Sequence, residues 1–400
     1  MVEKKTGFGV IFSNLGFMLL WLGQLTSQLA DRIFVYVLMI IIYQQTRSNL
    51  GVSLPLLAFG IPSVLVGPWA GVLVDRLDRK GILVVTALLR GLLTLLIIPF
   101  LTAPLQLIFL ISLLLYTMAQ FFAPAETSSI PELVDKHNLI IANALFMMTW
   151  MASSVVGFGL GAPIVNLFAE KNTLIVSAAL YFISATAVML IPIRSRPTAG
   201  KSHVCKDLLV GFEFIRRHGV VRFSLIQLFA AASAIATLSL LAISYAGDVL
   251  KIGERNFGYL IIAVGVGMLI GMFTLERIRY FLKMGTIVTA SFLLSGGLIV
   301  WLAMVKDLRL ALVLITLLGV GNIYITSTIQ TILQHRIPRQ IRGRVFGVQN
   351  MLVNSAFTLP VVLFGWIADL AGITNSMAML GWALLLVGVI GVLLPKLRRA

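Results

Sequence analysis

The sequence predicts an all-α membrane protein with twelve transmembrane helices in two six-helix halves. Hydrophobic residues fill 59% of the 400 positions and charged residues only 12%, about half the share usual in soluble proteins. The apolar residues form segments of about 20 residues, the length that a helix needs to cross a bilayer. Composition and segment length together override the two or three soluble domains that length alone would suggest.

Twelve segments are long and apolar enough to span a membrane. We place them at residues 15–43, 50–74, 82–101, 104–126, 139–168, 172–193, 220–247, 256–276, 284–304, 308–334, 345–368 and 374–395. Because their number is even, both termini lie on one side, and the basic residues near each terminus place that side in the cytoplasm. Lys4 and Lys5 precede an apolar run without a small-residue cleavage site, which indicates an uncleaved first span.

Basic residues are distributed unevenly between the two sides of the predicted membrane. Of the 31 Lys and Arg residues, about 23 fall in cytoplasmic loops, about 6 in outside loops and 2 within spans. This is the positive-inside bias of membrane proteins. The net charge of +16 therefore reflects topology, and we expect no nucleic-acid partner.

The longest polar segment divides the chain into two halves. We expect an N-terminal six-helix bundle over 1–193, a cytoplasmic linker over 194–219 and a C-terminal six-helix bundle over 220–400. The linker places Leu208, Leu209, Phe212 and Ile215 on one helical face, which predicts a short amphipathic helix on the cytoplasmic surface; a solvated linker is the alternative. The segments PELVDKHNLIIAN and PRQIRGRVFGVQN occupy matching places in the two halves and favour a parallel internal repeat.

The loop between the second and third spans reads GVLVDRLDRKG. Asp75 could cap a helix N-terminus, Gly71 permits close helix packing, and Arg76, Arg79 and Lys80 hold the cytoplasmic side. The loop resembles the signature G-x-L-x-D-R-x-G-R-[KR] of the major facilitator superfamily, from which it departs at Asp78. The resemblance implies a loop that latches the two halves together, with Asp75 and Arg76 as gating residues.

The fifth span contains a second short motif. Gly157, Gly161 and Pro163 follow G-x-x-x-G-x-P, a spacing that lets helices approach closely and can kink the span. The stretch resembles the antiporter motif of the same family, with Ala162 in place of a glycine, and this favours export. With ADRIFVYVLMIIIYQQTRSN, FFAPAETSSIPELV and IPRQIRGRVFGVQN, the chain resembles a bacterial drug-efflux branch that includes macrolide and enterobactin exporters, which implies the major facilitator fold and a bacterial plasma (inner) membrane.

Few spans carry an ionisable residue well inside the helix, where a charge costs about 2.5–3.5 kcal/mol on insertion scales. These proton or substrate coupling candidates are Asp31, Arg32, Arg90 and Glu126. Asp31 shares a helical face with Gln24, Ser27 and Gln28, whereas Arg32 points about 100° away. Arg90 is the natural partner of Asp31, and Glu126 is the alternative partner of Arg32 or Arg90. Two interpretations stay open: an ion-pair network that fixes packing, and a titratable carboxylate in a transport path.

Amide, hydroxyl and aromatic side chains of several spans are candidates to line a cavity for large amphiphiles. The cavity-lining candidates are Gln24, Gln28, Tyr36, Tyr116, Gln120, Trp150, Asn322, Gln330, Asn350 and Asn354. Asp369 lies near the outer end of the eleventh span, where capping or gating is the expected role.

The motifs exclude most other function classes. No Walker A loop, HExxH motif or catalytic triad order occurs, and with a single Cys and four scattered His we expect no enzyme, cofactor or metal site. We expect a monomeric secondary active transporter that exports amphiphilic small molecules (drugs, macrolides or siderophore-like compounds) in exchange for protons by alternating access. The alternatives are a facilitator or importer of a siderophore, lysolipid or metabolite, and a non-transporting sensor or assembly factor.

Overall fold

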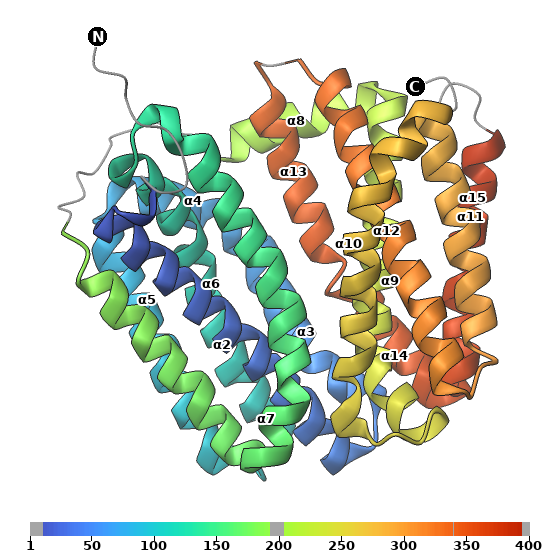
Figure 1. Cartoon of the computed structure of the whole chain (residues 1–400), viewed down its shortest axis with the longest axis horizontal. Helices are drawn as coiled ribbons and strands as arrows, with labels where there is room; N and C mark the ends of the chain where they lie inside the picture. The colour runs from blue at the N-terminus through green and yellow to red at the C-terminus, as the bar shows by residue number, and fades with distance from the viewer. Residues whose placement is uncertain (1–10, 193–203, 339, 394–400) are drawn as a thin grey trace. The chain divides into compact units, whose positions relative to one another are not determined.

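The computed structural model describes residues 11–192, 204–338 and 340–393, and these form helices with no β-strand among them (Figure 1). The helices pack into two compact units. Unit 1 holds the described residues of Met1–Ile41 and Ile61–Ser202, and unit 2 holds those of Ile42–Gly60 and His203–Ala400. Residues 42–60, which the sequence assigns to the first half, thus make their contacts within unit 2.

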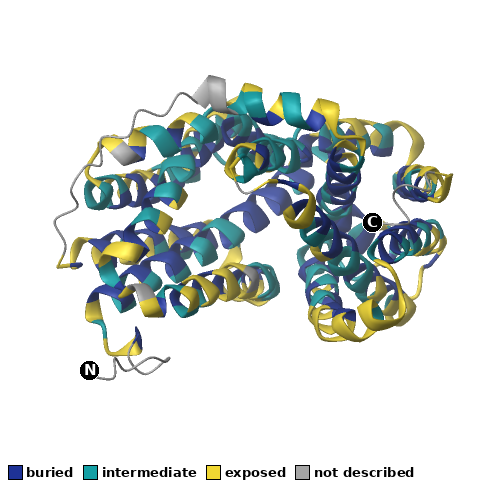
Figure 2. Cartoon of the chain, turned by 90° about the horizontal axis from the view of Figure 1, so that it is seen from above, coloured by how far each residue is buried: buried dark blue, intermediate teal, exposed yellow. Residues whose placement is uncertain are grey.

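Unit 1 is a helical bundle around an apolar core. It contains α2 (Leu15–Thr46) up to Ile41, the end of α3 (Asn49–Leu65), α4 (Gly67–Arg76), α5 (Arg79–Ile97), α6 (Leu105–Leu133) and α7 (Leu139–Met189). The core joins side chains of four helices: Phe17 and Leu20 of α2, Leu83 and Ala87 of α5, Phe122 of α6, and Phe146 and Val188 of α7. In Figure 2 the buried positions lie on the sides of these helices that face one another.

Unit 2 contains the remaining helices. They are α8 (Val204–Arg217), α9 (Gly219–Ser244) with a π-helical turn at Tyr245–Val249, α10 (Gly258–Phe281), α11 (Met284–Leu302), α12 (Leu308–Arg336), α13 (Arg342–Ser355), α14 (Leu359–Ala371) and α15 (Ile373–Leu393). Helices α10 and α12 are in backbone contact, because a Cβ on Gly267 would lie 1.9 Å from the carbonyl oxygen of Thr316. Small residues at such crossings are typical of membrane helices.

Ten helices of the described chain are each long and apolar enough to span a membrane, and the pair α3–α4, bent by 55°, raises the number to eleven. Pro68 stands in the first turn of α4, where a missing N–H is tolerated and a new helix can start. Helix α7 has 51 residues but is non-helical at Ala169 (φ 59°, ψ 170°), between the predicted spans 139–168 and 172–193. The all-α multi-pass class is confirmed, whereas the number twelve remains a prediction.

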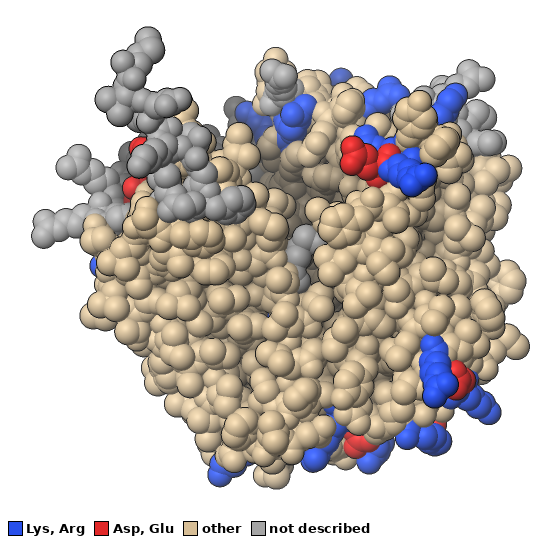
Figure 3. Space-filling view, viewed as in Figure 1, with Lys and Arg blue, Asp and Glu red and all other residues tan. Residues whose placement is uncertain are grey.

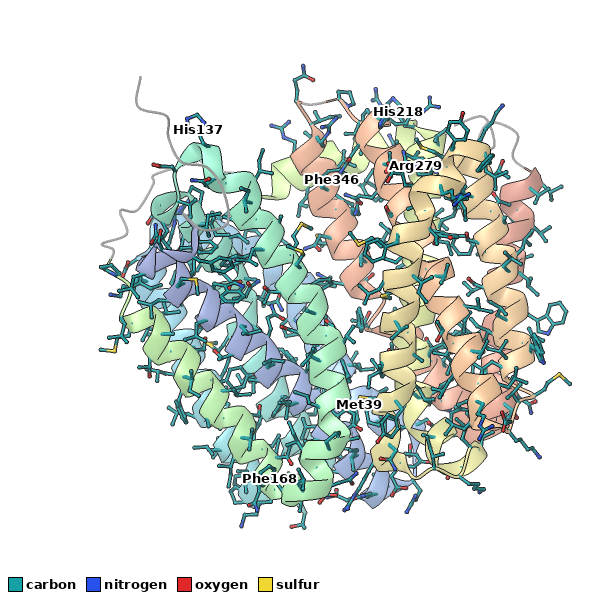
Figure 4. All side chains as sticks on the ribbon, in the orientation of Figure 1. Met39, His137, Phe168, His218, Arg279 and Phe346 are labelled. Carbon is teal, nitrogen blue, oxygen red and sulfur yellow. The ribbon has the colours of Figure 1, made fainter. Side chains whose placement is uncertain are left out.

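Charged side chains gather at the ends of the helices. Figure 3 shows those of unit 2 in two groups, with a wide uncharged band between them. Figure 4 places His218 and Arg279 at the same end of unit 2, and His137 and Phe168 at opposite ends of unit 1. His218 and Arg279 belong to two loops that the sequence predicts to be cytoplasmic. These two loops therefore lie at the same end of unit 2.

The segment 42–60 is held within unit 2 by side-chain hydrogen bonds. Asp369, at the end of α14, accepts hydrogen bonds from the amides of Asn49 (2.7 Å) and Leu50 (3.0 Å) and from the Ser48 hydroxyl (2.6 Å). It thereby caps the N-terminus of α3, where backbone N–H groups lack helical partners. Tyr43 donates a hydrogen bond to Asp248 nearby. Asp369 therefore has the capping role expected from its position near the end of a span.

Replacing Asp369 with Ala is expected to destabilise unit 2 by about 2 kcal/mol, because it removes a cap and leaves two amides without partners. Hydrogen exchange at Asn49 and Leu50 should accelerate, and the melting temperature in detergent should fall. Asp307→Ala is the matched control, since Asp307 accepts a single capping hydrogen bond, from Leu310 (2.9 Å), at the start of α12. Equal losses of stability in the two variants, with unchanged exchange at Asn49, would contradict this role.

Candidate functional site

Asp31 and Arg90 form an ion pair inside unit 1. An oxygen of the Asp31 carboxylate on α2 accepts hydrogen bonds from Arg90 of α5 and from the Tyr181 hydroxyl of α7, the latter at 2.5 Å. The side chain of Arg90 is 1% exposed and that of Asp31 is 21% exposed, so the guanidinium is enclosed whereas the Asp31 side chain is partly accessible. The partner of Asp31 is thus the one that the sequence suggested.

Several groups hold Arg90 besides the carboxylate. It donates a hydrogen bond to the Ser27 hydroxyl at 2.9 Å, and its charge lies 4.4 Å from the ring centre of Tyr181 and 5.6 Å from that of Phe122. Ser27 belongs to the polar face predicted for Asp31. Aromatic faces stabilise a desolvated cation, which helps to explain how a guanidinium is kept so far from water.

Tyr181 is a member of the site that sequence reasoning missed. Ser177, Tyr181 and Ser184 lie four and three residues apart and share one face of α7. The two serines donate to backbone carbonyls of α2, Ser177 to Ala30 at 2.9 Å and Ser184 to Gly23 at 2.7 Å. A polar stripe of this kind in an apolar span was the signal that could have revealed the contact with Asp31.

Glu126 is a second carboxylate in unit 1 and lacks an ion pair among the described residues. It is 4% exposed on α6, and its buried Oε1 has no hydrogen-bond partner. Its charge interaction is with the guanidinium of Arg90. An ionised carboxylate so placed carries a desolvation cost, which a bound proton or a cation would remove. The Arg90 guanidinium is therefore ion-paired with Asp31 and attracts Glu126 without forming an ion pair with it among the described residues.

Arg32 and Tyr36 pack against the glycine motif of α7. A Cβ on Gly157 would lie 2.5 Å from Cβ of Arg32, and one on Gly161 would lie 2.7 Å from the ring of Tyr36. Pro163 stands exposed within the same helix. The small residues of the motif therefore form the surface on which α2 lies, next to the Asp31–Arg90 pair.

We expect Gly157→Val to lower the stability of unit 1 by about 1–3 kcal/mol, because the added methyl groups overlap Arg32 and force α2 away from α7. The melting temperature in detergent measures the effect. Gly71→Ala is the control, since no described atom lies within 4 Å of a Cβ there. A Gly157→Val protein that melts at the wild-type temperature would show that this contact is not tight.

The loop after α4 makes contacts that the sequence did not predict. Asp78 caps α5 by accepting a hydrogen bond from the Gly81 amide at 2.9 Å, and the side chain of Asp75 lies outside the described residues. Arg79 pairs with Glu132 and donates to the Ser128 carbonyl at 3.0 Å. Asp78, the departure from the family pattern, thus acts as a helix cap.

The other loop residues have simpler surroundings. Lys80 donates to the Ile191 carbonyl at 2.7 Å, so the start of α5 is fixed to the end of α7, while Arg76 is exposed in the last turn of α4. No described atom lies within 4 Å of a Cβ built on Gly71, so the close packing expected of this residue stays a prediction.

The predicted cavity-lining residues divide into buried and accessible groups. Gln24, Tyr36 and Tyr116 are buried in unit 1, where Gln24 donates to the Phe146 carbonyl at 3.3 Å. Gln28 and Gln120 are half-buried and Trp150 is 53% exposed. In unit 2, Gln330 accepts a hydrogen bond from Gln349 at 2.8 Å, Asn322 and Asn354 are half-buried, and Asn350 is exposed. The half-buried and exposed residues remain candidates to line a substrate cavity.

Comparisons with known proteins agree on a transporter fold. The chain is 26% identical over 400 residues to the multidrug efflux pump Tap of Mycolicibacterium fortuitum, covering 95% of this chain and 96% of Tap. It is 25% identical over 333 residues to the enterobactin exporter EntS of Escherichia coli O157:H7, covering 82% and 80%. Among solved structures it resembles a bacterial homologue of the human lysosomal transporter Spinster, inward-facing and occupied, with a TM-score of 0.79 and 13% identity over 98% of this chain and 99% of that one.

A second solved structure leads to the same fold. The nucleoside transporter NupG superposes with a TM-score of 0.77 at 14% identity, covering 95% of this chain and 98% of that one. The family model of the Major Facilitator Superfamily matches residues 20–360. The chain is therefore a multi-pass transporter and no enzyme, and it belongs to the Major Facilitator Superfamily.

Proposed function

We propose that the protein exports amphiphilic small molecules in exchange for protons by alternating access. The direction is supported by the relatives, which include a multidrug efflux pump and an enterobactin exporter. It is also supported by the glycine motif of α7, which resembles the antiporter motif of the family. No nucleotide-binding loop occurs in the sequence, so an ion gradient is the proposed source of energy.

The observation that carries the proposed proton coupling is that Arg90 is ion-paired with Asp31 and also attracts a second carboxylate, that of Glu126. Asp31 is ion-paired and partly exposed, and Glu126 is buried with an oxygen that has no partner among the described residues. A proton that binds Asp31 neutralises it and weakens its hold on Arg90. The guanidinium is then free to turn toward Glu126, because a buried cation needs a counter-charge. Proton binding would in this way change the packing between α2, α5 and α6.

The proposed change in packing around Arg90 would also affect α7, which lies against α2. Arg32 follows Asp31 on α2 and lies on Gly157, with Tyr36 on Gly161 one turn further. A small rotation or shift of α2 would therefore displace the part of α7 that contains these two glycines. We propose that this contact passes the protonation state of Asp31 to the rest of the transport cycle, and that Gln28, Gln120 and Trp150 contact the substrate.

The remaining assignments follow from sequence and family. We propose a monomer in the bacterial inner membrane with both termini in the cytoplasm, as the distribution of basic residues predicts. Asp75 and Arg76 are proposed to gate the transition between outward-facing and inward-facing states. Arg79 and Lys80 would instead secure the loop to unit 1 through Glu132 and the Ile191 carbonyl.

Transport in proteoliposomes tests the proposed function. Ethidium and erythromycin serve as amphiphilic probes, and vesicles with an acidic lumen should accumulate them above the outside concentration when the protein is present. Collapse of the gradient with a protonophore should abolish the accumulation. Equilibration at the same rate without a gradient would instead identify a facilitator. The absence of flux for every amphiphile tried would favour a protein that does not transport.

A further inference from the structure

Helix α8 has one face packed against unit 2. A Cβ on Gly211 would lie 2.7 Å from the backbone oxygen of Arg344, so α8 and α13 are in backbone contact. Ile215, one turn later, is 8% exposed, and Leu208 reaches to 3.7 Å from the Cβ position of Gly347. Leu208, Gly211 and Ile215 share a helical face by their spacing. The orientation of α8 about its own axis is therefore set by α13.

The opposite face of α8 is apolar and basic. Leu209 is 68% exposed and Phe212 is 60% exposed, although both were predicted to share a face with Leu208 and Ile215. Arg216 lies on the same outward face, seven residues after Leu209, and its side chain is 68% exposed. A helix that offers large apolar residues beside arginines is typical of a membrane surface.

The position of α8 in unit 2 fits such a surface. Figure 1 draws α8 across the end of the unit 2 helices instead of along them, and Figure 4 places His218, which follows α8, at the same end as Arg279. The end of α10 there carries Tyr280, 86% exposed, and Phe281, 72% exposed. Exposed aromatic residues at helix ends mark the boundary between hydrocarbon and headgroups.

The charge at this end of unit 2 is strongly positive. The described basic residues in its loops and helix ends are Arg216, Arg217, Arg222, Arg277, Arg279, Lys283, Arg336, Arg342 and Arg344, and the acidic ones are Glu213 and Glu276. Glu213 pairs with Arg217 at 2.6 Å and Arg216 at 3.1 Å, and these hydrogen bonds lower the pKa of Glu213. The single negative charge of Glu213 balances only one of these two arginines, so an excess of positive charge remains beside Leu209 and Phe212.

We propose that the outward face of α8 binds the anionic phospholipid headgroups of the leaflet at this end of unit 2, with Leu209 and Phe212 inserted below the headgroups and Arg216 and Arg217 at the phosphates. Because α8 is seated on α13, the lipid surface would help to fix the start of α13. This inference concerns lipid binding and stands apart from the proposed export of amphiphiles.

A fluorescent label at position 209 tests the proposal. The full-length Leu209→Cys protein, with Cys205 replaced by Ser, carries bimane and is reconstituted into vesicles of phosphatidylcholine alone or mixed with phosphatidylglycerol. Quenching by doxyl-labelled lipid should be stronger in the anionic vesicles, and the difference should be lost at high salt. It should also be lost on Arg216→Gln combined with Arg217→Gln. Arg309→Gln, an exposed arginine at the start of α12, should change nothing.

Three other outcomes overturn the proposal. Equal lipid quenching in both kinds of vesicle would mean apolar insertion without recognition of anionic headgroups. Quenching by aqueous iodide but not by lipid would identify a solvated linker. Protection from both quenchers would show that protein covers this face. None of these readouts uses transport, so failure of the lipid proposal leaves the proposed function untouched, and the reverse also holds.

Discussion

Asp31→Asn is expected to abolish gradient-driven export while the protein stays folded. The amide keeps an oxygen that can accept the hydrogen bond from Tyr181, but it carries no charge and binds no proton near neutral pH. Probe accumulation in acidic vesicles should fall to the level seen without a gradient, because no proton can then be exchanged for the probe. The folded state should persist because Arg90 keeps its hydrogen bond to Ser27 and its contacts with the rings of Tyr181 and Phe122, and the attraction between Arg90 and Glu126 remains.

Asp78→Asn is the matched control for this experiment. It is the same chemical change at an exposed helix cap, where Asn also caps well, and export should stay at the wild-type rate. Export by Asp31→Asn at the wild-type rate would exclude Asp31 as the coupling acid and make Glu126 the candidate. Failure of Asp31→Asn to fold would favour an ion pair that only fixes helix packing.

The combined change Asp31→Asn and Glu126→Gln should destabilise the protein by more than the sum of the single changes. Each single variant leaves Arg90 one carboxylate, whereas the double variant leaves a guanidinium that is 1% exposed with neither. Removing the last partner of a buried charge costs about 3–5 kcal/mol. Melting temperatures in detergent of the wild type, both single variants and the double variant form the cycle that measures this coupling.

Replacing Arg90 provides the internal check on that cycle. In an Arg90→Met background the two carboxylate changes should no longer reinforce each other, because no buried cation is left to compensate. Additive effects of Asp31→Asn and Glu126→Gln in the wild-type background would contradict the sharing of Arg90. The comparison requires every variant to elute from gel filtration as a folded protein, so that the variants differ only in melting temperature.

Much of the fold could be predicted from the sequence, because it depends on properties of single segments and not on contacts between distant residues. Apolar segments of sufficient length define spans whatever lies around them, and Pro68 marks the place where the second predicted span bends. The pairing of Asp31 with Arg90 was predictable because buried charges in apolar helices need partners and few were available. Asp369 was likewise placed correctly as a cap from its position near a span end.

Other features depend on tertiary contacts that no local pattern encodes. The assignment of 42–60 to unit 2 arises from hydrogen bonds between residues far apart in sequence, such as Tyr43 with Asp248. The exposed face of α8 was misjudged because Gly211 brings α13 to one side of the helix and turns Leu209 and Phe212 outward. The described neighbours of Gly71 do not show the close packing that small residues often allow, so its role could not be read from its residue type.

Proton movement during transport tests the central claim most directly. Vesicles that contain pyranine and the wild-type protein report the pH of the lumen while ethidium is added outside at an imposed acidic interior. The account predicts that ethidium entry raises the lumenal pH, because protons leave in exchange, and that Asp31→Asn abolishes both changes. Ethidium entry without any change of lumenal pH, in the wild type, would contradict proton-coupled export through the Asp31–Arg90–Glu126 group.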